Sequence, residues 1–293
     1  MSDEQYTLAT TAPTQFVEIG TQRYAFRRFG SGDAVPLLCL QHFTGTLDNW
    51  DPIVTSALAR HREVILFDNA GIGRSSGEVP KTVSAMGDHV LVFLDSLELK
   101  AVDILGYSLG GMVAMDMVKK RPSLARKLVL VGTAPRGGED IMHLDKPSLA
   151  VHFADPTLKG YDILKKIFFT SSEKSQGAAT AFVQRLLLRQ FDREPISGPH
   201  VATAQVAAFR EWETFTGERF ADLRSIKQPT LVVNGVKDDM ISVKNSYYLV
   251  ENLPNAMLLV FPDAGHGSLF QYPSYFSKHV QEFLRNGDTT GIF

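Results

Sequence analysis

The sequence predicts an α/β fold in which a mostly parallel sheet is covered by helices on both faces. Short β-branched or aliphatic runs alternate with segments of helical periodicity, which is the pattern of such a fold. Hydrophobic residues make up 44% of the 293 residues, enough for a large core. We expect strands near residues 15–19, 23–29, 36–40, 63–67, 102–106, 128–132, 230–234 and 257–261.

The expected strands are of two kinds. The first two alternate apolar and polar side chains and are joined by a short turn at Gly20, so they predict an antiparallel hairpin at one edge of the sheet. The later runs, such as 128–132, are almost continuously apolar, as in central strands buried on both faces. Apolar residues three or four apart predict an amphipathic helix over 83–97, and a nearly all-apolar stretch predicts a deeply packed helix over 109–118.

The regular alternation stops between about residues 134 and 228. Helical stretches over 176–190 and 201–215 are separated there by loops rich in Pro and Gly, and the strand pattern resumes immediately afterwards. A helical lid inserted between two strands explains this pattern better than a second tandem domain does. We therefore predict a core of residues 1–133 and 229–293, with a helical cap over 134–228.

Composition excludes several classes of partner. The formal net charge of -2, with both signs interspersed, offers no basic surface for nucleic acid. No stretch approaches the ~18 apolar residues of a membrane span, and the polar, acidic start of the chain lacks the features of a secretory signal. The single cysteine, Cys39, lies in an apolar run and is expected in a buried strand. These features predict a cytoplasmic protein; they do not predict its oligomeric state.

The motif Gly106-Tyr107-Ser108-Leu109-Gly110 directly follows an apolar strand and directly precedes the deeply packed helix. A G-x-S-x-G match at such a junction is typical of a nucleophile held on a tight turn. Side chains at the two flanking glycines would collide with the neighbouring elements. The motif therefore indicates Ser108 as a catalytic nucleophile.

A serine nucleophile needs a base and an acid that orients it. The chain order serine, acid, histidine favours His266, which follows the last expected strand in a loop of small residues. The preceding strand is followed by Asp238 and Asp239, and we predict Asp238 as the acid while Asp239 remains the alternative. The backbone N–H groups of Leu109, next to the nucleophile, and of Phe43, after the third strand, are the expected donors to an oxyanion.

Five segments together resemble the α/β-hydrolase superfamily: the His42-Phe43 loop, the run from Asp68 to Ser75, the serine elbow, and the loops of Asp238 and His266. The resemblance covers nearly the whole chain outside 134–228. It implies an eight-stranded core with a helical cap between strands six and seven, and a turn-stabilising role for Asp68. Many relatives carry glycine where this chain has Phe43. Haloalkane dehalogenases and epoxide hydrolases carry an aspartate nucleophile, so Ser108 argues against both.

The expected reaction is hydrolysis of a small or medium, largely apolar carboxylic ester through an acyl-enzyme. Aromatic residues in and near the cap suggest an apolar pocket. We expect neither metal nor cofactor, because no metal-ligand cluster or complete dinucleotide fingerprint appears. The alternatives are a cofactor-free perhydrolase, a lactonase or a carbon–carbon hydrolase using the same triad, and a non-catalytic ligand sensor. The predicted pocket residues are His42, Tyr107, Phe168, Trp212 and Phe270.

Overall fold

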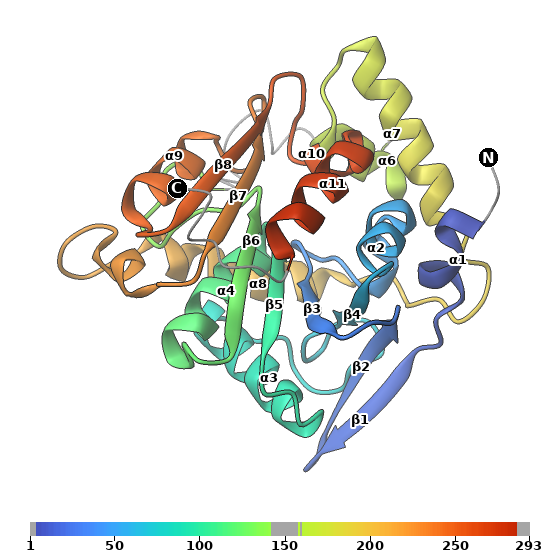
Figure 1. The fold of residues 1–293 in the computed structure, drawn as a ribbon, viewed down its shortest axis with the longest axis horizontal. Coiled ribbons are helices and arrows are strands. Elements are labelled where there is room, and N and C mark those ends of the chain that lie inside the picture. Colours follow the sequence, from blue (N-terminus) through green and yellow to red (C-terminus); the bar gives the residue numbers. More distant parts are fainter. Residues whose placement is uncertain (1–3, 142–157, 159, 286–293) are drawn as a thin grey trace.

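A computed structural model describes residues 4–141, 158 and 160–285. Its sheet has eight strands in the order β1-β2-β4-β3-β5-β6-β7-β8 (Figure 1). β2 pairs antiparallel with both β1 and β4, and the other neighbours are parallel. The predicted fold class is therefore confirmed. The strands are β1 (Gln15–Ile19), β2 (Gln22–Phe29), β3 (Ala34–Leu40), β4 (Arg62–Phe67), β5 (Val102–Tyr107), β6 (Ala125–Val131), β7 (Thr230–Gly235) and β8 (Ala256–Phe261).

Successive side chains of the central strands pack into two cores, one on each face of the sheet. Leu38 of β3 faces the core formed with α3 (Val83–Ser96) and α4 (Leu109–Lys120). Cys39 faces the core formed with α2 (Pro52–Leu58) and α11 (Pro273–Leu284). This alternation is the period of two expected for a strand buried on both sides. Cys39 is fully buried, as predicted, and burial raises the pKa of its thiol.

The chain between β6 and β7 contains α6 (Tyr161–Phe168), α7 (Glu173–Leu186), α8 (Pro199–Glu213) and the short helix η2 (Ala221–Ser225). α7 packs beside α2 and α10 (Ser268–Gln271), whereas α8 packs beside α3 on the other side of the sheet (Figure 1). This segment therefore contacts helices of both layers. α9 (Lys244–Asn252) lies between β7 and β8.

The start of β6 was predicted three residues too late. Arg126 and Lys127 look like loop residues in the sequence, but both belong to the strand. Their charges are satisfied in place: Arg126 pairs with the buried Asp103 at 2.5 Å, and Nζ of Lys127 donates to the carbonyl of Phe283 at 2.7 Å. Tertiary partners thus extend a strand that hydropathy alone would end.

Three short helices near the amino-terminal end were not predicted. α2 begins at Pro52 after Asp51, whose carboxylate accepts the backbone N–H of Ile53 at 3.2 Å. This acidic cap followed by proline is a recognisable helix start. α1 (Glu4–Thr11) has no amphipathic pattern of its own, and its Ala9 N–H donates to Oγ of Ser56 in α2. The third is η1 (Leu47–Asn49).

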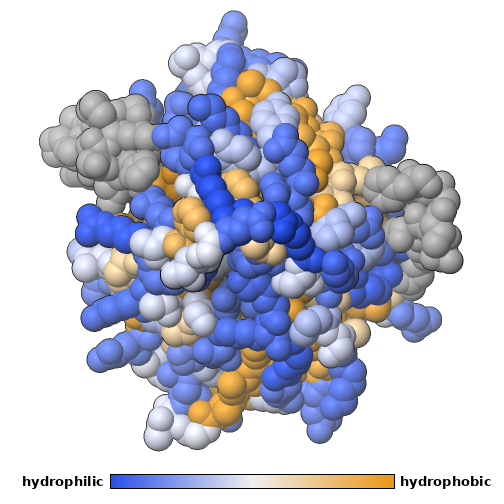
Figure 2. All heavy atoms as spheres, turned by 90° about the vertical axis from the view of Figure 1, so that its left-hand side faces the viewer, coloured by the Kyte–Doolittle hydropathy of each residue, from blue (hydrophilic) through white to orange (hydrophobic). Residues whose placement is uncertain are grey.

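The surface that carries α9 and β8 is mostly hydrophilic, with smaller hydrophobic areas among the hydrophilic residues (Figure 2). Among the described residues, no helix combines the length and the apolar character that crossing a bilayer requires.

Candidate active site

The turn between β5 and α4 holds the candidate nucleophile. Ser108 has φ of 55° and ψ of -119°, a conformation that residues with a side chain rarely adopt. A Cβ on Gly106 would lie 2.6 Å from Cα of Gly111, and one on Gly110 would meet the carbonyl of Leu40. The turn therefore requires glycine on both sides. It also places Ser108 at the amino-terminal end of α4, where partial positive charge gathers.

Asp238 and His266 meet at the carboxyl ends of β7 and β8. Nδ1 of His266 lies 2.8 Å from Oδ2 of Asp238, and both side chains are almost completely buried. Oδ1 of Asp238 accepts the backbone N–H groups of Met240 and Ile241, each at 2.9 Å. Because a carboxylate only accepts, the neutral imidazole carries its proton on Nδ1 and presents Nε2 as an acceptor. Asp239 is exposed, so the structure brings Asp238 to His266 and leaves Asp239 outside.

Ser108 and His266 each lie close to the end of β6. The backbone N–H of Ser108 donates to the carbonyl of Val131 at 2.8 Å. The next residue, Gly132, has φ of 51°, and a Cβ there would lie 3.2 Å from Cε1 and Nδ1 of His266. The imidazole therefore lies against the strand end to which the serine backbone is bonded.

Tyr107, the residue before the serine, holds the histidine loop. Its ring centroid lies 5.2 Å from that of His266, and its hydroxyl donates to the carbonyl of His266 at 3.3 Å. Burial, with Asp238 nearby, raises the pKa of Tyr107 well above its ordinary value, so the phenol stays uncharged. Tyr107 is thus a neutral support beneath the base.

The candidate oxyanion donors lie on two adjoining segments. Leu109 is the first residue of α4, and its neighbour Gly110 packs against the carbonyl of Leu40 at the end of β3. The loop that follows β3 turns tightly, with the N–H of Gly45 donating to the carbonyl of His42 at 3.1 Å. The structure therefore brings the loop of Phe43 next to the amino-terminal end of α4.

His42 organises this loop. Its Nδ1 lies 2.8 Å from the carbonyl oxygen of Phe43, which can only accept, so Nδ1 is the donor. Burial lowers the pKa of His42 to about 3, with a further contribution from His266, so the ring is neutral at physiological pH. A neutral ring that is bonded to its own loop has a structural role there.

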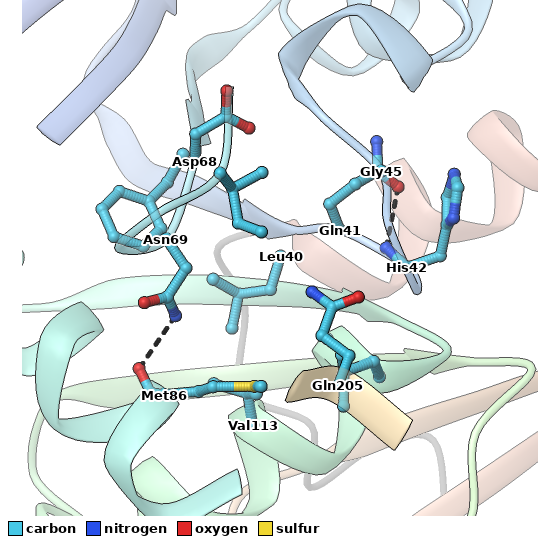
Figure 3. A pocket seen from close by; sticks show the side chains of 13 residues that line it. Leu40, Gln41, His42, Gly45, Asp68, Asn69, Met86, Val113 and Gln205 are labelled. Atoms are coloured by element: carbon cyan, nitrogen blue, oxygen red, sulfur yellow. Dashed lines mark hydrogen bonds between the residues drawn. The ribbon is translucent and has the colours of Figure 1, made fainter. Parts of the chain in front are cut away.

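Two cavities meet the loop of His42. The larger, of about 890 Å³, has a largely apolar wall and reaches His42 and Phe43. The smaller, of about 40 Å³, lies between that loop, Leu109 and Gly110 (Figure 3). The wall of the larger cavity is formed by His42, Phe43, Thr44, Thr46, Asp48, Asn49, Gly160, Tyr161, Ile163, Leu164, Arg193, Glu194, Pro195, Ile196, Ser197, Gly198, Pro199 and Ala202.

Of the five predicted pocket residues, only His42 lines the larger cavity. Tyr107, Phe168 and Phe270 are buried and pack against one another, with ring centroids 5.4 to 5.8 Å apart. Trp212 is buried on α8, and its indole N–H donates to the carbonyl of Ala134 at 3.1 Å. These four side chains therefore do not line the larger cavity and belong to the aromatic core around the site.

Sequence reasoning missed the residues that do form the wall. Ile163 and Leu164 lie on α6, and Pro195 and Ile196 lie in the loop before α8. None belongs to a motif, and their apolar character alone does not separate them from core residues. Gln205 was also missed, although a polar residue among the apolar positions of α8 was a signal that could have been noticed.

The chain belongs to the α/β hydrolase fold family, which matches residues 35–273. A solved α/β hydrolase fold protein from Chitinophaga pinensis is 39% identical with a TM-score of 0.89, covering 95% of this chain and 99% of that one. The putative carbamate hydrolase RutD of Caulobacter sp. (strain K31) is 28% identical over 237 residues, 80% of this chain and 85% of its own. The 2-hydroxymuconate semialdehyde hydrolase of Pseudomonas sp. (strain CF600) is 27% identical over 291 residues, 96% of this chain and 99% of its own. These findings identify a hydrolase of the α/β fold.

Proposed function

We propose that this protein is a serine hydrolase that cleaves small or medium, largely apolar carboxylic esters through an acyl-enzyme intermediate. The observation that carries the proposal is the buried contact of His266 with Asp238. The imidazole of His266 lies against the end of β6, and the backbone of the strained Ser108 is hydrogen-bonded to the same strand end. A serine on a strained turn and a histidine with one nitrogen oriented by a buried carboxylate are what acyl transfer requires, and the larger cavity reaches the adjoining loop of His42 and Phe43.

In the first half-reaction, Oγ of Ser108 attacks the ester carbonyl while Nε2 of His266 takes its proton. Asp238 stabilises the resulting imidazolium through the bond to Nδ1. The tetrahedral oxyanion accepts hydrogen bonds from the backbone N–H groups of Leu109 and Phe43. When the intermediate collapses, the imidazolium returns its proton to the leaving alcohol, and the acyl group remains on Ser108.

In the second half-reaction, a water molecule attacks the acyl carbonyl while His266 takes its proton. The same two backbone groups stabilise the second oxyanion, and collapse releases the carboxylic acid with the proton returned to Ser108. Both steps use one base and one oxyanion site, which explains why the three side chains act as a unit.

The larger cavity supports the choice of substrate class. Its volume of about 890 Å³ is in the usual range for small-molecule sites, and its apolar wall suits an aliphatic or aryl acyl group. Arg193, which also lines the cavity, donates to the hydroxyl of Tyr161 at 2.5 Å. We therefore expect an uncharged ester rather than a multiply charged substrate.

Related acyl-transfer reactions are the alternative. Two of the relatives are named as a putative carbamate hydrolase and a 2-hydroxymuconate semialdehyde hydrolase. A lactone, a carbamate, a carbon–carbon bond next to a carbonyl, or an acid with peroxide would use the same nucleophile and oxyanion site. Substrate tests decide between them, since the triad itself is common to all.

The test begins with an activity-based probe. A fluorophosphonate should label the wild-type protein at Ser108 and should not label Ser108→Ala. A p-nitrophenyl ester series from acetate to decanoate, beside a lactone, a carbamate and acetate with peroxide, then ranks the substrates by kcat/KM. We expect Ser108→Ala and His266→Ala each to lower kcat by about 10⁴-fold or more.

The control is Ser225→Ala, which removes an exposed hydroxyl from η2 and should leave turnover unchanged. Absence of labelling in the folded wild-type protein, or turnover that persists in Ser108→Ala, would overturn the proposal. Labelling of Ser108 without turnover of any substrate would instead favour a ligand sensor.

A further inference from the structure

Thr44 is held in an unfavourable backbone conformation at the rim of the site. Its φ of 57° lies in the left-handed region, which disfavours a β-branched residue. The turn from His42 to Gly45 closes over it, and Thr44 also lines the larger cavity. Such a conformation persists only where surrounding contacts hold it, so the contacts of Thr44 show which residues fix this turn.

The peptide unit between Phe43 and Thr44 is held at both ends by buried side chains. Its carbonyl oxygen accepts from Nδ1 of His42 at 2.8 Å, and its N–H donates to Oε1 of Gln205 at 2.6 Å. His42 is 4% exposed and Gln205 is 5% exposed, so both side chains are largely shielded from water. The two side chains together fix the orientation of this peptide plane.

Gln205 reaches the loop from α8, 161 residues further along the chain. Figure 3 shows its amide extending beside the small cavity toward the segment of Gln41 and His42. The other buried residues of α8 are apolar, namely Val201, Ala204, Ala208, Phe209 and Trp212. A buried amide on such a face is costly unless it is hydrogen-bonded, and the N–H of Thr44 supplies that bond.

We propose that Gln205 is a positioning residue for the oxyanion site. By accepting the N–H of Thr44, it keeps the peptide after Phe43 in the orientation that aims the Phe43 N–H at the reacting carbonyl. Without that acceptor, the strained turn from His42 to Gly45 relaxes at Thr44, and the backbone of Phe43 within the same turn shifts with it. The inference rests on the proposed function, and it makes the position of α8 a condition for oxyanion stabilisation.

The test compares Gln205→Leu, which removes the acceptor at similar volume, with Gln205→Glu, which keeps an acceptor oxygen. Two rates are measured: phosphonylation of Ser108 by a fluorophosphonate, and turnover of p-nitrophenyl butyrate. Gln205→Leu should lower both rates about tenfold or more. Removing an oxyanion donor lowers the rate by a larger factor, and a donor that is only displaced loses part of that stabilisation. KM should change by less than about threefold, and Gln205→Glu should restore most of the rate.

The control is Gln176→Leu, the same change on α7, where the amide donates to the carbonyl of Thr170 at 2.7 Å. It should leave both rates unchanged. Thermal unfolding of every variant separates folding from positioning, and Gln205→Met replaces the leucine variant if that one does not fold.

Several results would overturn the inference. They are rates within twofold of wild type for a folded Gln205→Leu or Gln205→Met, a glutamate variant as slow as the leucine variant, or an effect confined to KM. Failure of the proposed function looks different, because then the wild-type protein itself does not react at Ser108.

Discussion

Nδ1 of His266 lies 2.8 Å from Oδ2 of Asp238, and the second oxygen of the same carboxylate accepts two backbone N–H groups of the loop that carries it. The carboxylate is therefore fixed before the histidine uses it. A carboxylate held in this way orients the imidazole without rearrangement during the reaction. The adjacent Asp239 is exposed and has no part in this geometry.

Asp238→Asn should lower kcat by roughly 10³- to 10⁴-fold, because an amide in place of the carboxylate favours the wrong tautomer of His266 and does not stabilise the imidazolium. Asp239→Asn is the matched control and should keep near-normal turnover. Steady-state kinetics with one p-nitrophenyl ester check both. Equal activity of the two variants, or a larger loss in Asp239→Asn, would contradict the assignment.

The large cavity should set the preferred acyl chain length. Leu164→Trp adds volume at its wall, so kcat/KM for medium-chain esters should fall about tenfold relative to acetate, since contacts of a few methylene groups are lost. The chain-length series of p-nitrophenyl esters measures this. Leu188→Trp, at an exposed position, is the control. An unchanged profile in Leu164→Trp would show that acyl chains do not occupy this cavity.

Gly110→Ala should destabilise the protein by about 1–3 kcal/mol, because its Cβ would meet the carbonyl of Leu40 in a tightly packed region. Gly177→Ala is the matched control on α7, where a Cβ meets nothing within 4 Å. That change should stabilise by about 0.5–1 kcal/mol, as alanine favours a helix over glycine. Urea unfolding measures both free energies, and similar effects of the two substitutions would be inconsistent with the packing described.

Asp68 should make stability depend on pH. Burial raises its pKa well above the ordinary value, and Glu194 adds to this effect while Arg27 opposes it. Between the ordinary pKa of Asp and the raised folded-state pKa, the folded protein therefore keeps a proton on Asp68 that the unfolded chain has lost. The stability contributed by protonated Asp68 is fully present below the ordinary pKa of Asp and is lost as pH rises through the folded-state pKa.

Asp68→Asn cannot ionise and should become more stable relative to wild type as pH rises from 4 to 8, by at most about 1.4 kcal/mol per pH unit. Urea unfolding at a series of pH values tests this. A difference between the two proteins that stays constant across the series would argue against a raised pKa at Asp68.

Much of the fold was readable from the sequence because strand and helix patterns are local. All eight strands were predicted, with ends off by three residues or fewer. The strand end that was furthest off is the start of β6, where contacts with a distant segment determine the boundary. At Lys127, carbonyl groups near the end of α11 accept from the ammonium group and allow the charged residue to lie in the strand. α1 likewise depends on α2, since its own pattern is weak.

The sequence by itself determined the fold class, the serine turn with its glycines and the small set of side chains from which a triad could be drawn, since each rests on neighbours in the chain. Only the tertiary structure decided which of two adjacent aspartates meets His266, that Phe168 and Phe270 pack beneath the site, and that Gln205 reaches Thr44. The physical reason is that these choices depend on side-chain direction and on contacts between distant segments. Residue type and spacing along the chain do not specify either of them.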